Sequence, residues 1–278
     1  MIDLHLHTNL SDGSLEPGEL IDLFNSGDVI SITDHDEVGA IDKVLNIARI
    51  RKINLVPGIE LSTDYLKDGK NVEVHVLGYF IDYENSLLLE KLNEFKQSRV
   101  NAIEKMVGNL NNLGMYITTN DVKNMTRGTS LGRPHIARAL IKKGYFTQEQ
   151  TGYIIDTYLE DGKPCYFQRK RIPIEEAIDL IDSLHGVSSL AHPGFYKKLD
   201  NVDIENILKS NKFDAFEVFH PDNKKENIPF YLELAKKYNL QITCGSDYHG
   251  RNYHTELGDH TKLKQYDEKL ILNLIRLK

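Results

Sequence analysis

The chain alternates between short apolar runs and stretches in which apolar residues recur at helical spacing. A short run such as Val29–Ile32 is typical of a buried strand, whereas Ile41, Val44 and Leu45 predict a helix over about residues 37–51. The same reading predicts strands that end near residues 7, 32, 61, 79, 191, 219 and 244. Most of these strands are followed by a helix, which favours a mainly parallel α/β architecture.

From about residue 86 to residue 167 the pattern is helical throughout. A long helix over roughly residues 87–113 is followed by shorter helical segments, and no convincing strand interrupts them. We therefore interpret residues 86–167 as a helical insertion subdomain. The α/β domain that carries it is expected to consist of residues 1–85 and 168–278.

Histidine and carboxylate residues stand at or near the ends of nearly all the predicted strands. His5 and His7 lie two apart in the first strand, so both imidazoles face the same side, and Asp12 follows in the first loop. Asp247 and His249 repeat this spacing near the other end of the chain. The strands between them carry further residues of the same types: His35, Glu60, His75, His192 and His220. In barrel and doubly wound α/β proteins, such groups collect at the carboxyl ends of the strands, so we expect them to meet.

Imidazoles and carboxylates in this number indicate a metal centre. Taken alone, the His5 and His7 pair is explained as well by a surface pair or a hydrogen-bonded core pair as by metal binding. The recurrence of histidine and carboxylate residues at the strand ends favours metal binding. Nitrogen and oxygen ligands suit zinc, iron or manganese and do not choose among them.

Composition and net charge limit the class of protein, its compartment and its partners. With 278 residues, 40% of them hydrophobic, the chain can bury a large core. The sequence contains no run of ~18 apolar residues, so no membrane span is expected. The first residues do not resemble a signal peptide. Only two cysteines occur, Cys165 and Cys244, so we expect a cytoplasmic protein.

The net charge of −7 argues against broad binding of nucleic acid, duplex DNA included. It does not exclude a phosphorylated substrate, because bound cations invert the local sign of charge.

Six motifs resemble those of the PHP (polymerase and histidinol phosphatase) family, in the family's order. They are Asp3–His7, Thr33–Asp36, Pro57–Glu60, the strand with His75, Ala191–Pro193 and Gly245–His249. The resemblance spans the whole chain and implies a distorted (β/α)7 TIM-like barrel with three divalent metal ions. It assigns His5, His7, Glu60 and Asp247 to one ion, Glu60, His75 and His192 to a second, and Asp12, His35 and His249 to the third.

The resemblance also indicates a branch of the family. Asp12 stands where the family's histidinol phosphatases usually carry a histidine, and Gly132–Arg138 resembles the PHP phosphoesterases of nucleoside bisphosphates and short RNA. The implied activity is metal-dependent hydrolysis of phosphate esters by a metal-bridged hydroxide, without a protein nucleophile. The expected substrate is a small nucleotide such as a 3′,5′-nucleoside bisphosphate, or the 5′ end of a short RNA. The alternatives are a histidinol-phosphate phosphatase and a non-catalytic metal-binding PHP module.

Four residues are candidate substrate contacts. Arg133 and His135 would grip a phosphate, the arginine through its bidentate fork. Lys163 and the basic run Arg169–Arg171 would line the same cleft if the insertion folds over the barrel mouth. Because a basic run is more often solvated surface, the run is interpreted as surface and only Lys163 is kept as a candidate. His220 ends a strand on the appropriate side, either as a substrate contact or as a residue just outside the metal ligands.

Among the remaining ionisable residues, Asp34 is expected to be either a turn residue or a hydrogen-bond acceptor that orients His5 or His35. Three further histidines are interpreted as structural: His185, His254 and His260.

Overall fold

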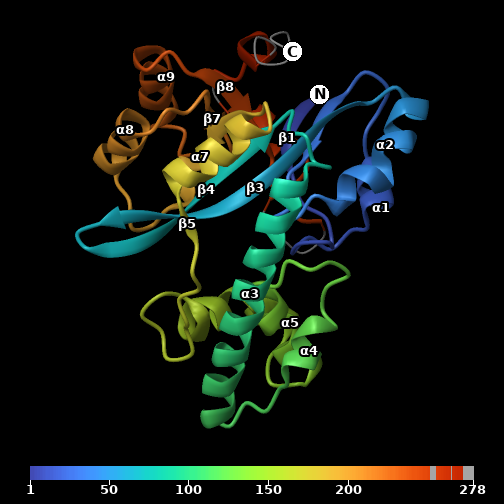
Figure 1. Cartoon of the computed structure of the whole chain (residues 1–278), viewed down its shortest axis with the longest axis vertical. Coiled ribbons are helices and arrows are strands. Elements are labelled where there is room, and N and C mark those ends of the chain that lie inside the picture. The colour runs from blue at the N-terminus through green and yellow to red at the C-terminus, as the bar shows by residue number, and fades with distance from the viewer. Residues whose placement is uncertain (251–254, 264, 272–278) are drawn as a thin grey trace.

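A nearly closed sheet forms the centre of the molecule in a computed structural model, which describes residues 1–250, 255–263 and 265–271 (Figure 1). Within these residues, the strands follow one another in the order β1-β2-β3-β4-β6-β7-β8. Their bounds are Ile2–Leu6 (β1), Val29–Ile32 (β2), Asn54–Lys67 (β3), Lys70–Tyr79 (β4), Val187–Leu190 (β6), Ala215–Phe219 (β7) and Gln241–Cys244 (β8). A short strand, β5 (Ile172–Pro173), pairs with β3 outside this path.

Neighbouring strands run parallel except at β4, which is antiparallel to both β3 and β6. The β3–β4 hairpin is therefore the irregular part of the barrel, and its tip projects away from the other strands (Figure 1). At the opposite seam, a bridge between Leu6 and Tyr248 joins β1 to the segment after β8. The expected distorted TIM-like barrel is confirmed.

Helices cover the outside of the sheet and form a separate layer below it (Figure 1). Those beside the sheet are α1 (Pro17–Ile21), α2 (Gly39–Arg51), α7 (Ile174–Ser183), α8 (Asn201–Ser210) and α9 (Ile228–Lys237). The others are α3 (Ser86–Asn112), α4 (Thr119–Lys123), α5 (Arg133–Lys142) and α6 (Thr151–Ile154), which continues as a π-helical turn, Ile155–Leu159. Local sequence explains several starts: Asn85 caps α3 and Asp200 caps α8 through their side chains, and Pro134 occupies the first turn of α5.

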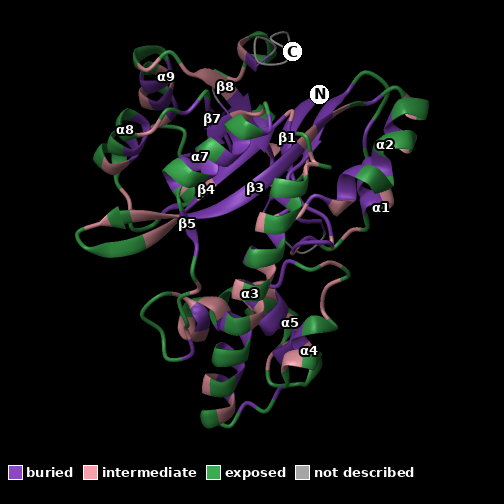
Figure 2. Ribbon diagram, viewed as in Figure 1, coloured by how far each residue is buried: buried purple, intermediate pink, exposed green. Residues whose placement is uncertain are grey.

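Helix α3 spans two hydrophobic clusters. Leu88, Leu92 and Phe95 in its first half pack into the barrel core, whereas Met106 and Leu110 belong to a cluster made only by residues between 100 and 166. Buried positions accordingly gather both in the sheet and among α3, α4 and α5 (Figure 2). On the basis of this separate cluster, we propose that residues 86–167 form a subdomain beside the barrel.

None of the described helices combines the length and the apolar character needed to cross a membrane.

Candidate metal centre

Glu60 lies at the centre of a group of histidines inside the barrel. Its side chain is fully buried, and five imidazole nitrogens lie within 3.3 Å of its two oxygens. Oε2 faces His5 Nε2 (3.3 Å), His7 Nε2 (3.2 Å) and His35 Nδ1 (2.8 Å), and Oε1 faces His75 Nδ1 (2.8 Å) and His192 Nε2 (2.8 Å). A carboxylate in this position can bridge cations, because each oxygen has two lone pairs.

Two further carboxylates complete the group from opposite ends of the chain. Asp247 Oδ1 lies 3.1 Å from His7 Nε2 and 3.4 Å from His5 Nε2. Asp12 Oδ1 lies 3.2 Å from His249 Nε2, and Asp12 Oδ2 lies 3.8 Å from His35 Nε2. All nine ligands implied by the resemblance therefore converge on one place.

The donor atoms fit divalent metal ions. Four sets lie within 4.8 Å: His7, Asp12, His35 and His249; His5, His220 and Asp247; His5, His7 and Glu60; and His35, Glu60 and His75. Several of these buried atoms form no hydrogen bond with the rest of the protein and face only other members of the group, among them His5 Nε2, His7 Nε2, His35 Nδ1, His220 Nε2 and Glu60 Oε2. Buried polar atoms without partners are costly, and coordination to a cation would satisfy them.

The charges of the centre are strongly coupled. Burial would by itself raise the pKa of Glu60, but the facing imidazoles hold that pKa well below its ordinary value. Burial would likewise lower the pKa of His7 and His75. Asp247 and Glu60 instead raise the pKa of His7 to about 10, and Glu60 and Glu73 raise the pKa of His75 to about 9. In the absence of metal these imidazoles hold protons, which metal ions must displace.

His220 lies beside the candidate metal ligands, which agrees better with a place next to the metal centre than with a substrate contact. Its side chain is fully buried, and its Nε2 lies 3.6 Å from Asp247 Oδ2. It forms one of the possible ligand sets with His5 and Asp247, and it does not line the pocket described below. Strand-end position identified the residue, but it could not separate a metal ligand from a substrate contact.

Glu217 is the residue that sequence reasoning missed. It is fully buried in β7, where its Oε1 lies 3.0 Å from His5 Nδ1 and its Oε2 accepts a hydrogen bond from the His192 backbone N–H at 2.7 Å. The available signal was its isolation as the one charged residue within the apolar strand Ala215–Phe219.

Asp34 does not orient His5 or His35. It accepts hydrogen bonds from the Thr8 backbone N–H (2.7 Å), the Thr8 hydroxyl (2.6 Å) and the Ser11 hydroxyl. It therefore fixes the first loop, which carries Asp12.

Three histidines are interpreted as structural from the sequence. His260 is buried, with Nε2 2.8 Å from the Ile2 carbonyl oxygen. His185 follows α7 and has a φ of 56°, and His254 lies outside the described residues.

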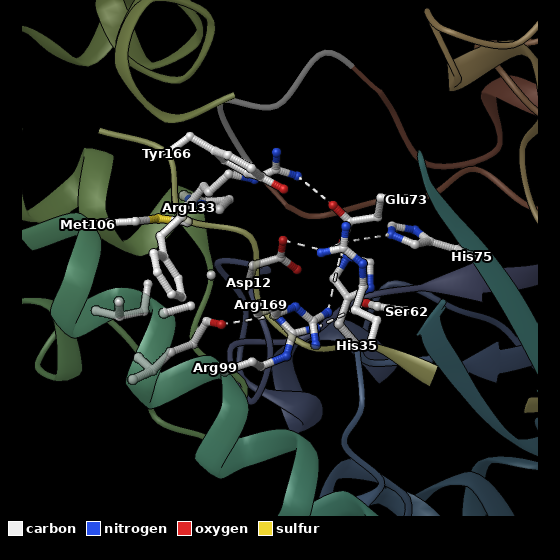
Figure 3. Close-up of a pocket in the computed structure, with 17 residues that line it drawn as sticks. Asp12, His35, Ser62, Glu73, His75, Arg99, Met106, Arg133, Tyr166 and Arg169 are labelled. Atoms are coloured by element: carbon white, nitrogen blue, oxygen red, sulfur yellow. Dashed lines mark hydrogen bonds and ion pairs between the residues drawn. The ribbon is translucent and has the colours of Figure 1, made fainter. Parts of the chain in front are cut away.

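A pocket of about 90 Å³ opens directly beside the metal centre, between the barrel and the helical layer (Figure 3). Asp12, His35 and His75 line one side of it, and Arg133 and Tyr166 line the other. Arg133 Nη2 lies 3.2 Å from Glu73 Oε2 across the pocket. The pocket thus joins the metal centre to a basic wall.

The other two expected contacts do not reach this pocket as cations. His135 is fully buried behind it, where its Nδ1 accepts a hydrogen bond from the Gly132 backbone N–H at 3.0 Å and burial lowers its pKa to about 4. Lys163 is exposed and is absent from the residues that line the pocket.

Arg169 and Arg171 take the place expected of Lys163. Both line the pocket, with side chains only 10% and 4% exposed, so the interpretation of this run as solvated surface is wrong. Lys170 between them is exposed, as expected for alternate residues of an extended segment. The signal in the sequence was this alternation, next to the aromatic Tyr166 and Phe167.

Comparisons with known proteins agree with this geometry. No protein-family model matches the chain. The chain is 30% identical over 263 residues to the 5′-3′ exoribonuclease Rnm of Escherichia coli K12, covering 92% of this chain and 87% of that protein. It is 27% identical over 254 residues to a 3′,5′-nucleoside bisphosphate phosphatase of Chromobacterium violaceum, covering 89% and 87%.

A solved structure from Bifidobacterium adolescentis, named as a metal-dependent phosphoesterase, superposes with a TM-score of 0.84. The match covers 99% of this chain and 95% of that one, at 25% identity. Together with the motifs and the metal-binding geometry, these matches show that the chain belongs to the PHP family of metal-dependent phosphoesterases.

Proposed function

We propose that the protein hydrolyses phosphate esters of small nucleotides, namely 3′,5′-nucleoside bisphosphates or the 5′ ends of short RNAs. The observation that carries this proposal is the direct opening of the metal centre onto an arginine-lined pocket. Asp12, His35 and His75 belong to both. A phosphate ester held by the arginines would therefore lie beside the metal ligands. The names of the two curated relatives support a nucleotide or RNA substrate.

Three divalent metal ions are proposed for the centre. Glu60 would bridge two of them, with the remaining eight ligands divided as the family resemblance implies and His220 as a further candidate. Such ions supply Lewis-acid stabilisation of phosphoryl oxygens and an activated water nucleophile. The donor set of imidazoles and carboxylates fits manganese, iron or zinc.

The protein's own groups would position the ester. The guanidinium of Arg133 can donate two parallel hydrogen bonds to a phosphate of the substrate, which fixes the orientation of that phosphate and compensates its charge. His135, with a pKa of about 4, is neutral at ordinary pH and supports the first turn of α5, which carries Arg133. Met106 and Tyr166 give the pocket an apolar side, against which a nucleoside would pack.

The rival functions make different predictions. Histidinol phosphate carries one phosphate and a cationic amine, which a basic wall of arginines would repel. A non-catalytic module would need no substrate pocket beside its metal ligands.

We also propose that duplex DNA is not a substrate, since the chain has a net charge of −7. The protein would work in the cytoplasm, where the buried, free Cys165 and Cys244 would stay reduced.

A screen for both inorganic phosphate and released mononucleotides tests the proposal, because hydrolysis at the 5′ end of an RNA yields a nucleotide and not free phosphate. Manganese-loaded protein is assayed with adenosine 3′,5′-bisphosphate, a 5′-phosphorylated trinucleotide RNA and histidinol phosphate. We expect release from the nucleotide substrates and little from histidinol phosphate. His7→Ala and Asp247→Asn should abolish release without unfolding the protein, and Lys163→Ala, outside the pocket, should leave it unchanged. Preference for histidinol phosphate, or wild-type rates in Asp247→Asn, would contradict the proposal.

A further inference from the structure

Arg169 is the least closely paired guanidinium of the pocket. Arg99 donates to Asp36 Oδ2 from Nε at 2.9 Å and from Nη2 at 2.6 Å. Arg171 Nε donates to Asp64 Oδ1 at 2.8 Å. Arg169 Nη2 lies 3.4 Å from Asp36 Oδ2, an oxygen that already accepts both bonds from Arg99. Its next acidic neighbour, Glu73 Oε1, lies 3.8 Å away.

The positive charge of Arg169 is therefore only partly compensated by the carboxylates of Asp36 and Glu73. Burial, and then the nearby Arg99, lower the pKa of Arg169 to about 10, against the smaller opposing effects of Asp36 and Glu73. A buried cation is stabilised only when anions and hydrogen-bond acceptors surround it closely. A guanidinium has five donors, and that of Arg169 lines the pocket (Figure 3) with one donor directed at Asp36.

The size of the cavity limits what could supply that charge. Its volume of about 90 Å³ is well below the roughly 300–1,000 Å³ of pockets that enclose a whole organic ligand. It suits one phosphate group of a nucleotide, whose nucleoside would lie at the open side of the pocket. Arg133 borders the same space, and its contact with Glu73 Oε2, at 3.2 Å, leaves further donors of its fork available.

We propose that Arg169, together with Arg133, forms a subsite for a second, non-scissile phosphate of the substrate. The subsite adjoins His35 and His75, so one phosphate would lie at the metal centre while the other lies between the two arginines. This inference rests on the proposed function and adds to it: Arg169 makes the enzyme prefer nucleotides with two phosphates over those with one. Neither Lys163 nor Lys170 serves this role, because both side chains are exposed and lie outside the pocket lining.

The test compares substrates that differ by one phosphate. Initial rates are measured for manganese-loaded wild type and Arg169→Met with adenosine 3′,5′-bisphosphate, adenosine 3′-monophosphate and adenosine 5′-monophosphate. Because a hydrogen bond to a charged group contributes about 1.5–3 kcal/mol, kcat/KM for the bisphosphate should fall roughly ten- to hundredfold in the variant. The values for the monophosphates should stay within about threefold, since those substrates leave the subsite empty. Arg169→Lys should recover part of the loss by restoring charge without the fork.

The controls separate the subsite from stability and from metal binding. Lys170→Met changes the exposed neighbour and should leave all three rates unchanged. Thermal unfolding and metal analysis of Arg169→Met show whether the variant folds and keeps its ions. A 5′-phosphorylated dinucleotide tests whether the subsite also takes a phosphate of RNA. A loss shared by the bisphosphate and the dinucleotide assigns the subsite to both substrates, whereas a loss with the dinucleotide alone contradicts the preference for a bisphosphate.

The outcomes also separate this inference from the proposed function. If wild type hydrolyses none of these nucleotides, whether measured by phosphate or by mononucleotide release, the proposed function is wrong. If wild type is active but Arg169→Met lowers all rates equally, or lowers none, the subsite is wrong and the function stands.

Discussion

At the scale of single residues, the buried carboxylate of Glu217 fixes the orientation of a predicted metal ligand. It contacts His5 Nδ1 and so leaves His5 Nε2 directed at Glu60 and Asp247. A carboxylate behind an imidazole raises the basicity of the ligand and fixes its ring, and loss of such a partner typically costs about 10–100-fold in metal affinity.

We therefore expect Glu217→Gln to weaken manganese binding about tenfold or more while the protein stays folded. Equilibrium dialysis with metal analysis measures the affinity, and circular dichroism checks the fold. Glu233→Gln, on the exposed side of α9, is the matched control and should bind metal as the wild type does. Unchanged affinity in Glu217→Gln would refute the orienting role.

The raised pKa values of His7 and His75 predict a pH dependence of stability. Burial alone would lower both, but the neighbouring carboxylates raise them to about 10 and about 9, above the ordinary value of 6.5. Protonated imidazoles then stabilise the metal-free fold fully below pH ~6.5, and this contribution is lost as the pH rises through the folded-state values. We expect the Tm of metal-free protein to fall between pH ~7 and pH ~9.

Added manganese should reverse this trend, because metal ions replace the protons and compete better as the proton concentration falls. The increase in Tm on adding manganese should therefore grow with pH over the same range. Differential scanning calorimetry on chelated and reloaded samples measures both quantities. A metal-free Tm that rises with pH would contradict the assigned charges.

At the scale of elements, α3 joins the helical layer to the barrel through one buried ion pair. Arg99, in the middle of the helix, binds Asp36 after β2 and also donates to the Leu131 carbonyl oxygen at 3.0 Å. Both side chains are less than a tenth exposed. Removing one partner of a buried pair leaves the other charge uncompensated, at a cost of about 3–5 kcal/mol.

Arg99→Met should accordingly lower the free energy of unfolding by about 3 kcal/mol, measured by urea denaturation. Lys105→Met, on an exposed position of the same helix, should change it by less than about 0.5 kcal/mol. In a double-mutant cycle, Asp36→Asn should cost less in the Arg99→Met background than in wild type, because the carboxylate has lost its closest partner and keeps only the longer contact with Arg169. Additive effects would show that the pair is not coupled.

Local patterns in the sequence predicted the elements better than their arrangement. The strand ends and the long helix follow from periods of about 2 and 3.6 residues, which are properties of neighbouring positions. The antiparallel pairing of β4 with β3 did have a local signal, because Asp68 and Gly69 form the two-residue turn typical of a hairpin. Its pairing with β6, which is far away in sequence, had none. Lys163 and Arg169 could not be ranked for the same reason, since their exposure depends on how the insertion lies over the barrel.

At the scale of the whole molecule, the metal centre depends on closing the two ends of the chain against each other. Asp3 in β1 accepts hydrogen bonds from the Ser246 backbone N–H at 2.9 Å and from the Ser246 hydroxyl at 2.7 Å. This contact holds Asp247 beside His5 and His7. The sequence showed the matching spacings at both ends, but Glu217 escaped notice because its partner His5 is 212 residues away.

Gly245 makes this closure possible and gives the sharpest test of it. A Cβ atom at Gly245 would overlap the Cβ of His5 and lie 2.7 Å from the His5 backbone nitrogen. Gly245→Ala must therefore push β1 away from the end of β8. We expect a loss of about 1–3 kcal/mol in the free energy of unfolding from overpacking, together with weaker metal binding.

Gly108→Ala is the opposite case, because Gly108 lies within α3 and a Cβ there would meet nothing within 4 Å. That substitution should stabilise the protein by about 0.4–1 kcal/mol and leave metal content unchanged. Urea denaturation and metal analysis of both variants measure the contrast. Full metal occupancy in Gly245→Ala would show that the centre does not need the tight contact between the first and last strands.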